Sequence, residues 1–150
     1  MHVTHGIDIH ASPDVVYKVW TDLDRWPEWT ASVSRVERID PGPLAIGLRA
    51  RVHQPKLLPA VWRVTELEEG RGFTWVSVSP GARVTAGHWI EPRAGGSRAT
   101  SSITFEGPIG RLAGWLWQSL TRRYLLLEGD GLKARSEERI PFESELTDNR

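Results

Sequence analysis

The sequence predicts an α+β domain: one curved antiparallel sheet of about seven strands, two short helices after the first strand, and a long C-terminal helix. Three patterns carry this prediction. An alternating apolar and polar segment at the N-terminus is followed by apolar residues at helical spacing. Further short segments then alternate with a period of two between turns that contain glycine or proline. A long amphipathic segment follows, and one helix available to cover one sheet is typical of an α+β arrangement.

The first elements follow from residues 2–29. Residues 2–10 alternate, with the apolar side chains and His5 on one side, which indicates a half-buried strand. Ser12 is suited to cap a helix, and Pro13 is suited to its first position. Pro27 lies inside RWPEW and interrupts the helical pattern. We therefore expect two short helices separated by a break.

From Val33 onward the period becomes two. Gly- or Pro-containing turns separate the apolar runs, which favours an antiparallel meander. In the second run Leu48, Ala50 and Val52 should face inward, opposite arginine and histidine side chains. The expected strands cover residues 33–40, 48–53, 61–68, 73–79, 84–91 and 97–106.

The C-terminal segment predicts one long helix from Pro108 to about Arg135. Gly129 and Gly131 weaken its second half, so we expect a bend or fraying there. Residues 1–137 are expected to form the domain, and the polar residues 138–150 a loose tail. An apolar stripe at helical spacing consists of Ile109, Leu112, Leu116, Leu120 and Tyr124.

Length, charge and cysteine content exclude several classes of protein and site. The 150 residues are long enough for one domain with its own core, and 19 basic residues balance 19 acidic ones. A nucleic-acid-binding protein usually carries a net positive charge, and this chain does not. The chain has no cysteine, which excludes disulfides and thiolate metal sites. It shows no signal-peptide pattern and no apolar run long enough to span a bilayer, so we expect a cytoplasmic location.

Three stretches carry a family resemblance: SPDVVYKVWTDLDRWPEW, GHWIEP and FEGPIGRL. With the order of elements, they resemble the START/Bet v 1-like (SRPBCC) helix-grip superfamily, and within it the polyketide cyclase/dehydrase-type branch, over residues 1–135. The resemblance implies a deep apolar cavity between sheet and C-terminal helix, gated near the two short helices. It implies no universal catalytic motif, and the superfamily includes both carriers and enzymes.

Some aromatase/cyclases of this superfamily place an arginine, a tryptophan and a hydroxyl residue on the inner face of a middle strand. The comparable strand here offers Leu48, Ala50 and Val52 inward. This difference argues against cyclase activity.

His88 is the candidate catalytic residue. It shares a strand face with Val84, Ala86 and Ile90, opposite a charged face, so it should point into the cavity. There it could orient a carbonyl or hydroxyl group, or act as a general acid or base. The alternative is a core histidine that is hydrogen-bonded to the backbone or to Ser101.

Three of the eight tryptophans, Trp20, Trp26 and Trp29, lie in the stretch WTDLDRWPEW. We favour a structural role for the cluster, which would wedge the short helices against the sheet. Trp20 keeps step with the helical apolar residues and should be core. Trp29, just past Pro27, is the one expected to contact a ligand.

We therefore expect the cavity to bind a small hydrophobic or amphipathic ligand such as a lipid, quinone or polyketide. Alternatives are a polyketide cyclase/dehydrase (aromatase)-like enzyme built around His88, and a protein-interaction module without a ligand. No metal or cofactor, no nucleic acid and no stable membrane insertion are expected, and the protein should be a monomer or homodimer. The expected ligand-binding residues are Trp29, Trp62, Trp75, Ser77, His88, Ile90, Ser101, Phe105, Leu116, Leu120 and Tyr124.

The last helix also allows a different interpretation. Trp115 and Trp117 precede Arg122 and Arg123, a pattern compatible with docking at a membrane surface. The neutral overall charge favours instead a helix that covers the cavity and keeps its arginines in solvent.

Overall fold

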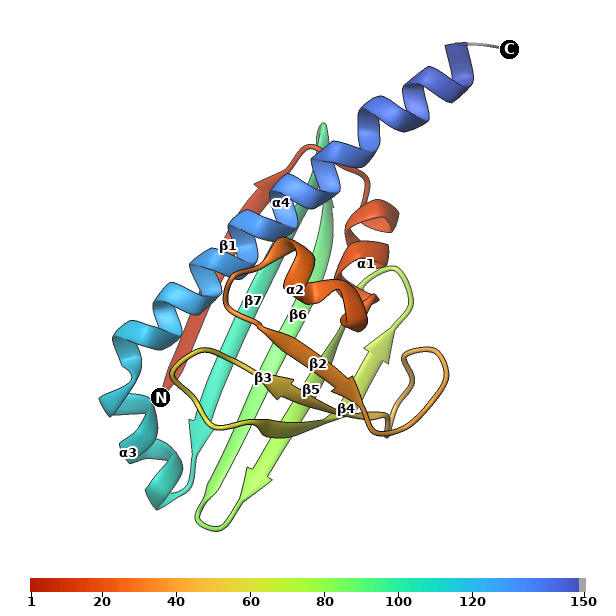
Figure 1. Ribbon diagram of the computed structural model, residues 1–150. Coiled ribbons are helices and arrows are strands. Elements are labelled where there is room, and N and C mark those ends of the chain that lie inside the picture. Colours follow the sequence, from red (N-terminus) through yellow and green to blue (C-terminus); the bar gives the residue numbers. More distant parts are fainter. Residues whose placement is uncertain (149–150) are drawn as a thin grey trace.

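A computed structural model describes residues 1–148, with side chains described through Glu138 (Figure 1). The elements follow the predicted order of strand, short helices, six strands and C-terminal helix. They are β1 (His2–Ile9), α1 (Pro13–Thr21), the 3-10 helix η1 (Leu23–Arg25), α2 (Trp26–Trp29), β2 (Arg35–Arg38), β3 (Arg49–His53), β4 (Ala60–Glu68), β5 (Gly72–Ser79), β6 (Ala82–Arg93), β7 (Gly96–Glu106), α3 (Pro108–Leu116) and α4 (Gln118–Asp148).

All seven strands form one antiparallel sheet in the order β1-β7-β6-β5-β4-β3-β2. Consecutive strands from β2 to β7 are neighbours, and β1 pairs with β7 at the far edge. Figure 1 shows α4 crossing one face of the curved sheet alongside β1 and β7, with α1 and α2 on the same side. The predicted α+β helix-grip fold is confirmed.

The N-terminal helices form as their local sequence predicts. Ser12 caps α1, because its Oγ accepts a hydrogen bond from the backbone N–H of Val15 at 3.4 Å. Pro13 occupies the first turn, and Val16, Val19 and Trp20 bury one face. Pro27 lies in the first turn of α2, where its missing N–H costs nothing. The predicted break between the two short helices is η1.

Strand parity is also as predicted in the middle of the sheet. On β3 and just before it, Leu48, Ala50 and Val52 are buried, whereas Arg49 and Arg51 are exposed. The inward side chains join those of α1 and α2 in one hydrophobic core. This core lies on one face of the sheet, and α4 covers the same face beside β1 and β7.

The C-terminal helix differs from the prediction in where it breaks. The chain forms two helices that meet at Trp117, and α4 passes Gly129 and Gly131 without interruption. A Cβ on Gly129 would lie 2.9 Å from the His5 ring, and one on Gly131 would lie 1.8 Å from the carbonyl oxygen of Trp29. The glycines therefore allow α4 to approach β1 and α2 closely.

The end of α4 is a second difference. The helix continues past Arg135 to Asp148, so the backbone of residues 138–148, expected as a loose tail, is helical. The last two positions of that expected tail, 149 and 150, lie outside the described residues.

Candidate functional site

A cavity of about 410 Å³ lies between the sheet, the first half of α4 and the loop at residues 54–59. Its walls come from α2, from strands β3 to β7, and from the α3–α4 junction. The volume falls in the ordinary range of small-molecule sites. Seven of the residues predicted to bind a ligand line this space: Trp62, Trp75, His88, Ser101, Phe105, Leu120 and Tyr124.

Aromatic rings form one wall of the cavity. Trp62 on β4 stacks against Trp75 on β5, with ring centroids 5.6 Å apart and planes at 28°. Trp26 of α2 tilts against Trp75 at 5.3 Å, and its indole N–H donates to the Trp20 carbonyl at 3.0 Å. These rings hold each other in fixed orientations and offer flat apolar surfaces to a ligand.

His88 is buried on β6 and faces the cavity as parity predicts. Its ring stacks on Phe73, with centroids 4.3 Å apart, and its Nδ1 lies 3.3 Å from the Phe73 carbonyl oxygen. A carbonyl can only accept, so Nδ1 carries the proton and Nε2 keeps its lone pair. Burial lowers the pKa of His88 from 6.5 to about 3, and the bond to Phe73 offsets part of the shift. His88 is therefore a neutral hydrogen-bond acceptor.

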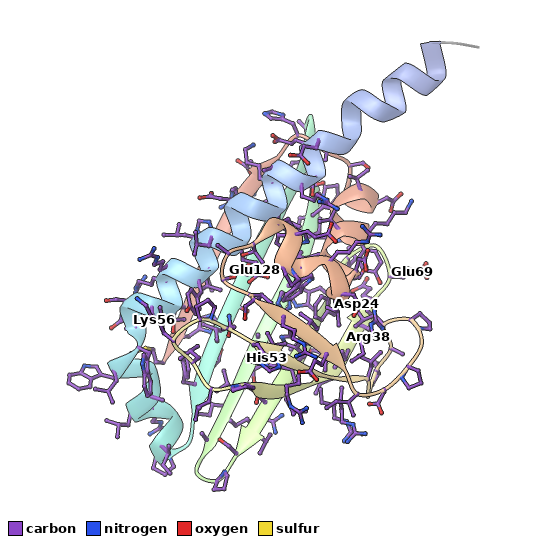
Figure 2. All side chains as sticks on the ribbon, in the orientation of Figure 1. Asp24, Arg38, His53, Lys56, Glu69 and Glu128 are labelled. Atoms are coloured by element: carbon purple, nitrogen blue, oxygen red, sulfur yellow. The ribbon has the colours of Figure 1, made fainter. Side chains whose placement is uncertain are left out.

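Glu128 of α4 is the main site residue that the sequence analysis missed. Figure 2 shows it beneath α4, over the sheet face. Its Oε1 accepts a hydrogen bond from the Trp20 indole at 2.8 Å and lies 3.6 Å from Nε2 of His88. Its side chain is only 13% exposed. Burial raises the pKa of Glu128 from 4.5 to about 7, and the Trp20 hydrogen bond opposes the rise.

Together Glu128 and His88 form a polar pair in an apolar wall. Below pH 7 the carboxyl is largely protonated and can donate, while His88 Nε2 can accept. At 3.6 Å the two atoms are too far apart for a direct hydrogen bond. Both groups are therefore free to bond a hydroxyl or carbonyl group of a ligand.

A signal for Glu128 was present in the sequence. It lies four residues after Tyr124 and eight after Leu120, on the apolar stripe of the predicted helix. A carboxylate on the buried face of a helix is unusual and points to a specific partner. The predicted stripe ends at Tyr124, one helical turn before Glu128.

Both predicted environments of His88 are present: the ring is hydrogen-bonded in the core, and it also lines the cavity. The ring hydrogen-bonds the backbone of Phe73, as the alternative proposed. Ser101 lies opposite His88 in the β6–β7 register and also lines the cavity. His88 is thus held by the core while one edge of its ring meets the cavity.

Trp29, which was expected to contact a ligand, lies outside the cavity lining. Trp26 of the same helix lines the cavity instead. The Trp29 ring packs on Trp26 at 5.8 Å and contacts Gly131 of α4. α2 is turned so that Trp26 packs on Trp75 of the sheet while Trp29 packs on α4. Its position corresponds to the wedge role that the cluster was expected to have.

Three other predicted residues also lie outside the lining. Leu116 is 58% exposed, because the break at Trp117 changes the helical register and places Trp117 at the cavity. Ile90 shares a strand face with His88 but belongs to the closed core. Ser77 lies past Trp75 toward the end of β5 and is half-buried.

The cavity opens between the loop at residues 54–59 and the start of α4. The hydroxyl of Tyr124 donates to the Pro55 carbonyl and connects the two sides. Lys56, Leu57 and Leu58 line this opening and are exposed, with Leu58 at 89%. Figure 2 places Lys56 beside the first turns of α4. The resemblance implied a gate near the short helices, whereas the exposed part of the lining lies on this other side.

A curved antiparallel sheet that grips a long helix around an apolar cavity defines the START/Bet v 1-like class. Within it, the chain belongs to the family described as "Polyketide cyclase / dehydrase and lipid transport", whose model matches residues 1–137. The predicted resemblance is thus confirmed.

Solved structures show the same fold at low sequence identity. The Zhui aromatase/cyclase from a Streptomyces species has a TM-score of 0.72 at 16% identity, over 93% of this chain and 95% of that one. Major latex-like protein 151 from Panax ginseng has a TM-score of 0.71 at 14% identity, over 91% and 97%. The chain matches 51% of a two-domain aromatase/cyclase from the steffimycin biosynthetic pathway, with a TM-score of 0.69 at 16% identity over 92% of this chain.

No match was found among curated proteins. Across residues 1–148, none of the helices combines the length and apolar character needed to cross a bilayer.

Proposed function

We propose that this protein binds a small amphipathic ligand, with an apolar ring system against the tryptophan wall and a hydroxyl or carbonyl group at Glu128 and His88. One observation carries the proposal: a cavity of about 410 Å³ that contains a buried carboxyl and imidazole with no direct hydrogen bond between them. Trp20 occupies Oε1 of Glu128 and Phe73 occupies Nδ1 of His88, so a ligand would bond to Oε2 of Glu128 and Nε2 of His88. The family's association with polyketides and lipids supports the same class of ligand.

The aromatic wall favours a ring-bearing ligand over a simple acyl chain. The stacked Trp62 and Trp75 rings present flat faces, which pack well against a planar quinone or aromatic polyketide. Burial of such a ligand would contribute about 25 cal/mol for each Å² of apolar surface. Specificity would then come from the hydrogen bonds at Glu128.

A matched pair of probes tests this arrangement in the purified protein. 2-Naphthol and naphthalene share a ring system and differ by one hydroxyl group, and both can be titrated by quenching of tryptophan fluorescence. In Glu128→Leu we expect 2-naphthol affinity to fall by roughly tenfold, the value of one hydrogen bond to a buried polar group. Naphthalene affinity should stay unchanged.

Glu138→Leu is the control, because Glu138 is exposed on the same helix. It should leave both affinities unchanged. Equal losses for both probes in Glu128→Leu would show a general packing defect, and no loss for 2-naphthol would refute the role of Glu128.

A polyketide cyclase/dehydrase-type activity is the second candidate, and the Glu128–His88 pair is the observation that favours it. A carboxyl with a pKa of about 7 is a suitable general acid near neutral pH. An imidazole with a pKa of about 3 is a poor proton acceptor, however. This mismatch, together with the apolar inner face of β3, favours binding over turnover.

Glu128→Gln distinguishes the two functions. Glutamine keeps a hydrogen-bond donor and acceptor but cannot transfer a proton. A carrier should therefore retain 2-naphthol binding, and a cyclase assayed with an aromatic polyketide precursor should lose turnover while retaining affinity. The expected cytoplasmic location remains a prediction, which fractionation of the host cell would test.

A further inference from the structure

Helix α3 packs on the sheet with its small residues. Gly110 and Gly114 are buried, and a Cβ on Gly110 would lie 3.4 Å from Ala82. A Cβ on Gly114 would lie only 2.8 Å from the Phe105 ring. The face of α3 toward the protein therefore carries almost no side chain, which brings the helix backbone close to β6 and β7.

The large apolar residues of α3 point the other way. They follow at helical spacing on one face and are more than half exposed, the reverse of an ordinary surface helix. We call this face the α3 patch. It consists of Ile109, Leu112, Trp115 and Leu116, which are 57%, 55%, 67% and 58% exposed.

The α3 patch continues toward the rim of the cavity. Trp117 follows directly at the α3–α4 junction, is 46% exposed and lines the opening. Leu57 and Leu58 lie in the loop on the other side of this opening. A contiguous exposed apolar surface of this kind marks an interaction site.

Positive charge surrounds this apolar surface. Residues 107–127 contain Arg111, Arg122 and Arg123 but no aspartate or glutamate, and Lys56 lies on the facing loop. All four basic side chains are exposed, and within the described part of the chain none forms an ion pair. The neutral charge of the whole chain thus conceals a local cationic surface.

We propose that the α3 patch and the cavity rim dock on an anionic lipid surface. Tryptophan and leucine side chains would enter the interface while the arginines and Lys56 contact the headgroups. A second copy of the chain fits less well, because self-association through this face would bring two cationic surfaces together. The contact is peripheral, and it would place the cavity mouth against the lipid.

Such docking would let an apolar ligand pass between lipid and cavity without crossing water. This transfer step rests on the proposed function, whereas docking itself requires no ligand in the cavity. The two proposals can therefore fail separately.

Cosedimentation of the full chain with lipid vesicles tests the docking. We expect binding to vesicles of phosphatidylcholine with phosphatidylglycerol, weakened by salt, and much weaker binding to phosphatidylcholine alone. Arg122→Gln/Arg123→Gln should weaken binding to the anionic vesicles by roughly tenfold or more. Trp115→Ser should also weaken it severalfold, because an exposed anchor is removed.

Matched controls lie elsewhere on the molecule. Ile46→Ser removes a side chain that is 67% exposed, as Trp115 is, from the loop between β2 and β3. Arg71→Gln/Arg93→Gln removes the same charge from the β4–β5 turn and from the end of β6, away from α3 (Figure 1). Both controls should bind anionic vesicles as the wild type does.

Three results would overturn the proposal. One is no binding to anionic vesicles, and another is equal loss in the controls and the α3 variants. The third is a wild-type dimer in sedimentation velocity that Trp115→Ser converts to monomer, since the patch would then hold a second copy. Thermal unfolding of each variant verifies that all compared proteins are folded.

Discussion

At the scale of single residues, Glu128 and His88 determine what the cavity can recognise. Burial favours the neutral form of both groups, so it raises the pKa of Glu128 and lowers that of His88. Neither shift requires the other residue to be charged. The pair is thus a neutral donor and acceptor below pH 7, suited to a hydroxyl or carbonyl group.

This assignment predicts how Glu128 changes stability with pH. Between pH 4.5 and about 7 the unfolded state releases the Glu128 proton and the folded state keeps it, so this group makes stability fall as pH rises. Glu128→Gln removes that effect. We expect the variant to gain up to about 3 kcal/mol in unfolding free energy relative to the wild type between pH 4.5 and pH 8.

Urea unfolding of both proteins at the two pH values measures this difference. His88 contributes the opposite trend, because its lowered pKa makes stability fall as pH drops from 6.5 toward 3. The comparison between variant and wild type isolates Glu128 from that background. A constant difference at both pH values would contradict the assignment.

Position and orientation of the site residues were only partly predictable. Strand parity placed His88, Trp62 and Trp75 on the inner face, because a strand turns each successive side chain by a fixed half-turn. The choice between Trp26 and Trp29 was not predictable, because it depends on how α2 is turned against α4. That angle is set by packing between segments distant in the sequence.

At the scale of elements, the glycines of α4 show where local propensity misled the prediction. Propensity alone makes Gly131→Ala stabilising by about 1 kcal/mol. The structure predicts the opposite sign, because the new Cβ would lie 1.8 Å from the Trp29 carbonyl oxygen. We expect a loss of about 2 kcal/mol or more in the free energy of unfolding, within the range for overpacking.

Chemical denaturation distinguishes the two signs directly. Ala134→Gly on the exposed face of α4 is the control for propensity, and it should cost about 1 kcal/mol. If Gly131→Ala instead stabilised the protein, the close approach of α4 to α2 would be wrong.

The break between α3 and α4 was likewise not predictable from the pattern of apolar residues. The stripe from Ile109 to Tyr124 keeps an unbroken helical period, which predicted one helix. Gly110 and Gly114, four residues apart, form a second face, and that face packs on the sheet. Both faces recur at helical spacing, so periodicity alone does not tell which of them packs on the sheet.

At the scale of the whole molecule, the order of elements and the antiparallel sheet were predictable from period and turn chemistry. The turns that join β4, β5, β6 and β7 are short, and consecutive strands from β2 to β7 are neighbours in the sheet. Prediction of the cavity required the family resemblance as well, because periodicity does not tell whether side chains fill the space between helix and sheet. The patterns also do not identify a ligand, since fold alone does not determine function.

The central claim is that the cavity holds a small amphipathic ligand, and cavity filling tests it most directly. Ala113 lines the cavity from α3, whereas Ala134 is exposed on α4, so Ala113→Trp and Ala134→Trp make the same change on two helices. Native mass spectrometry of each protein purified from its own host is the measurement. We predict a bound small molecule in the wild type and in Ala134→Trp, and its loss in Ala113→Trp. A wild type that carries no bound molecule, or an Ala113→Trp variant that keeps it, would contradict this account.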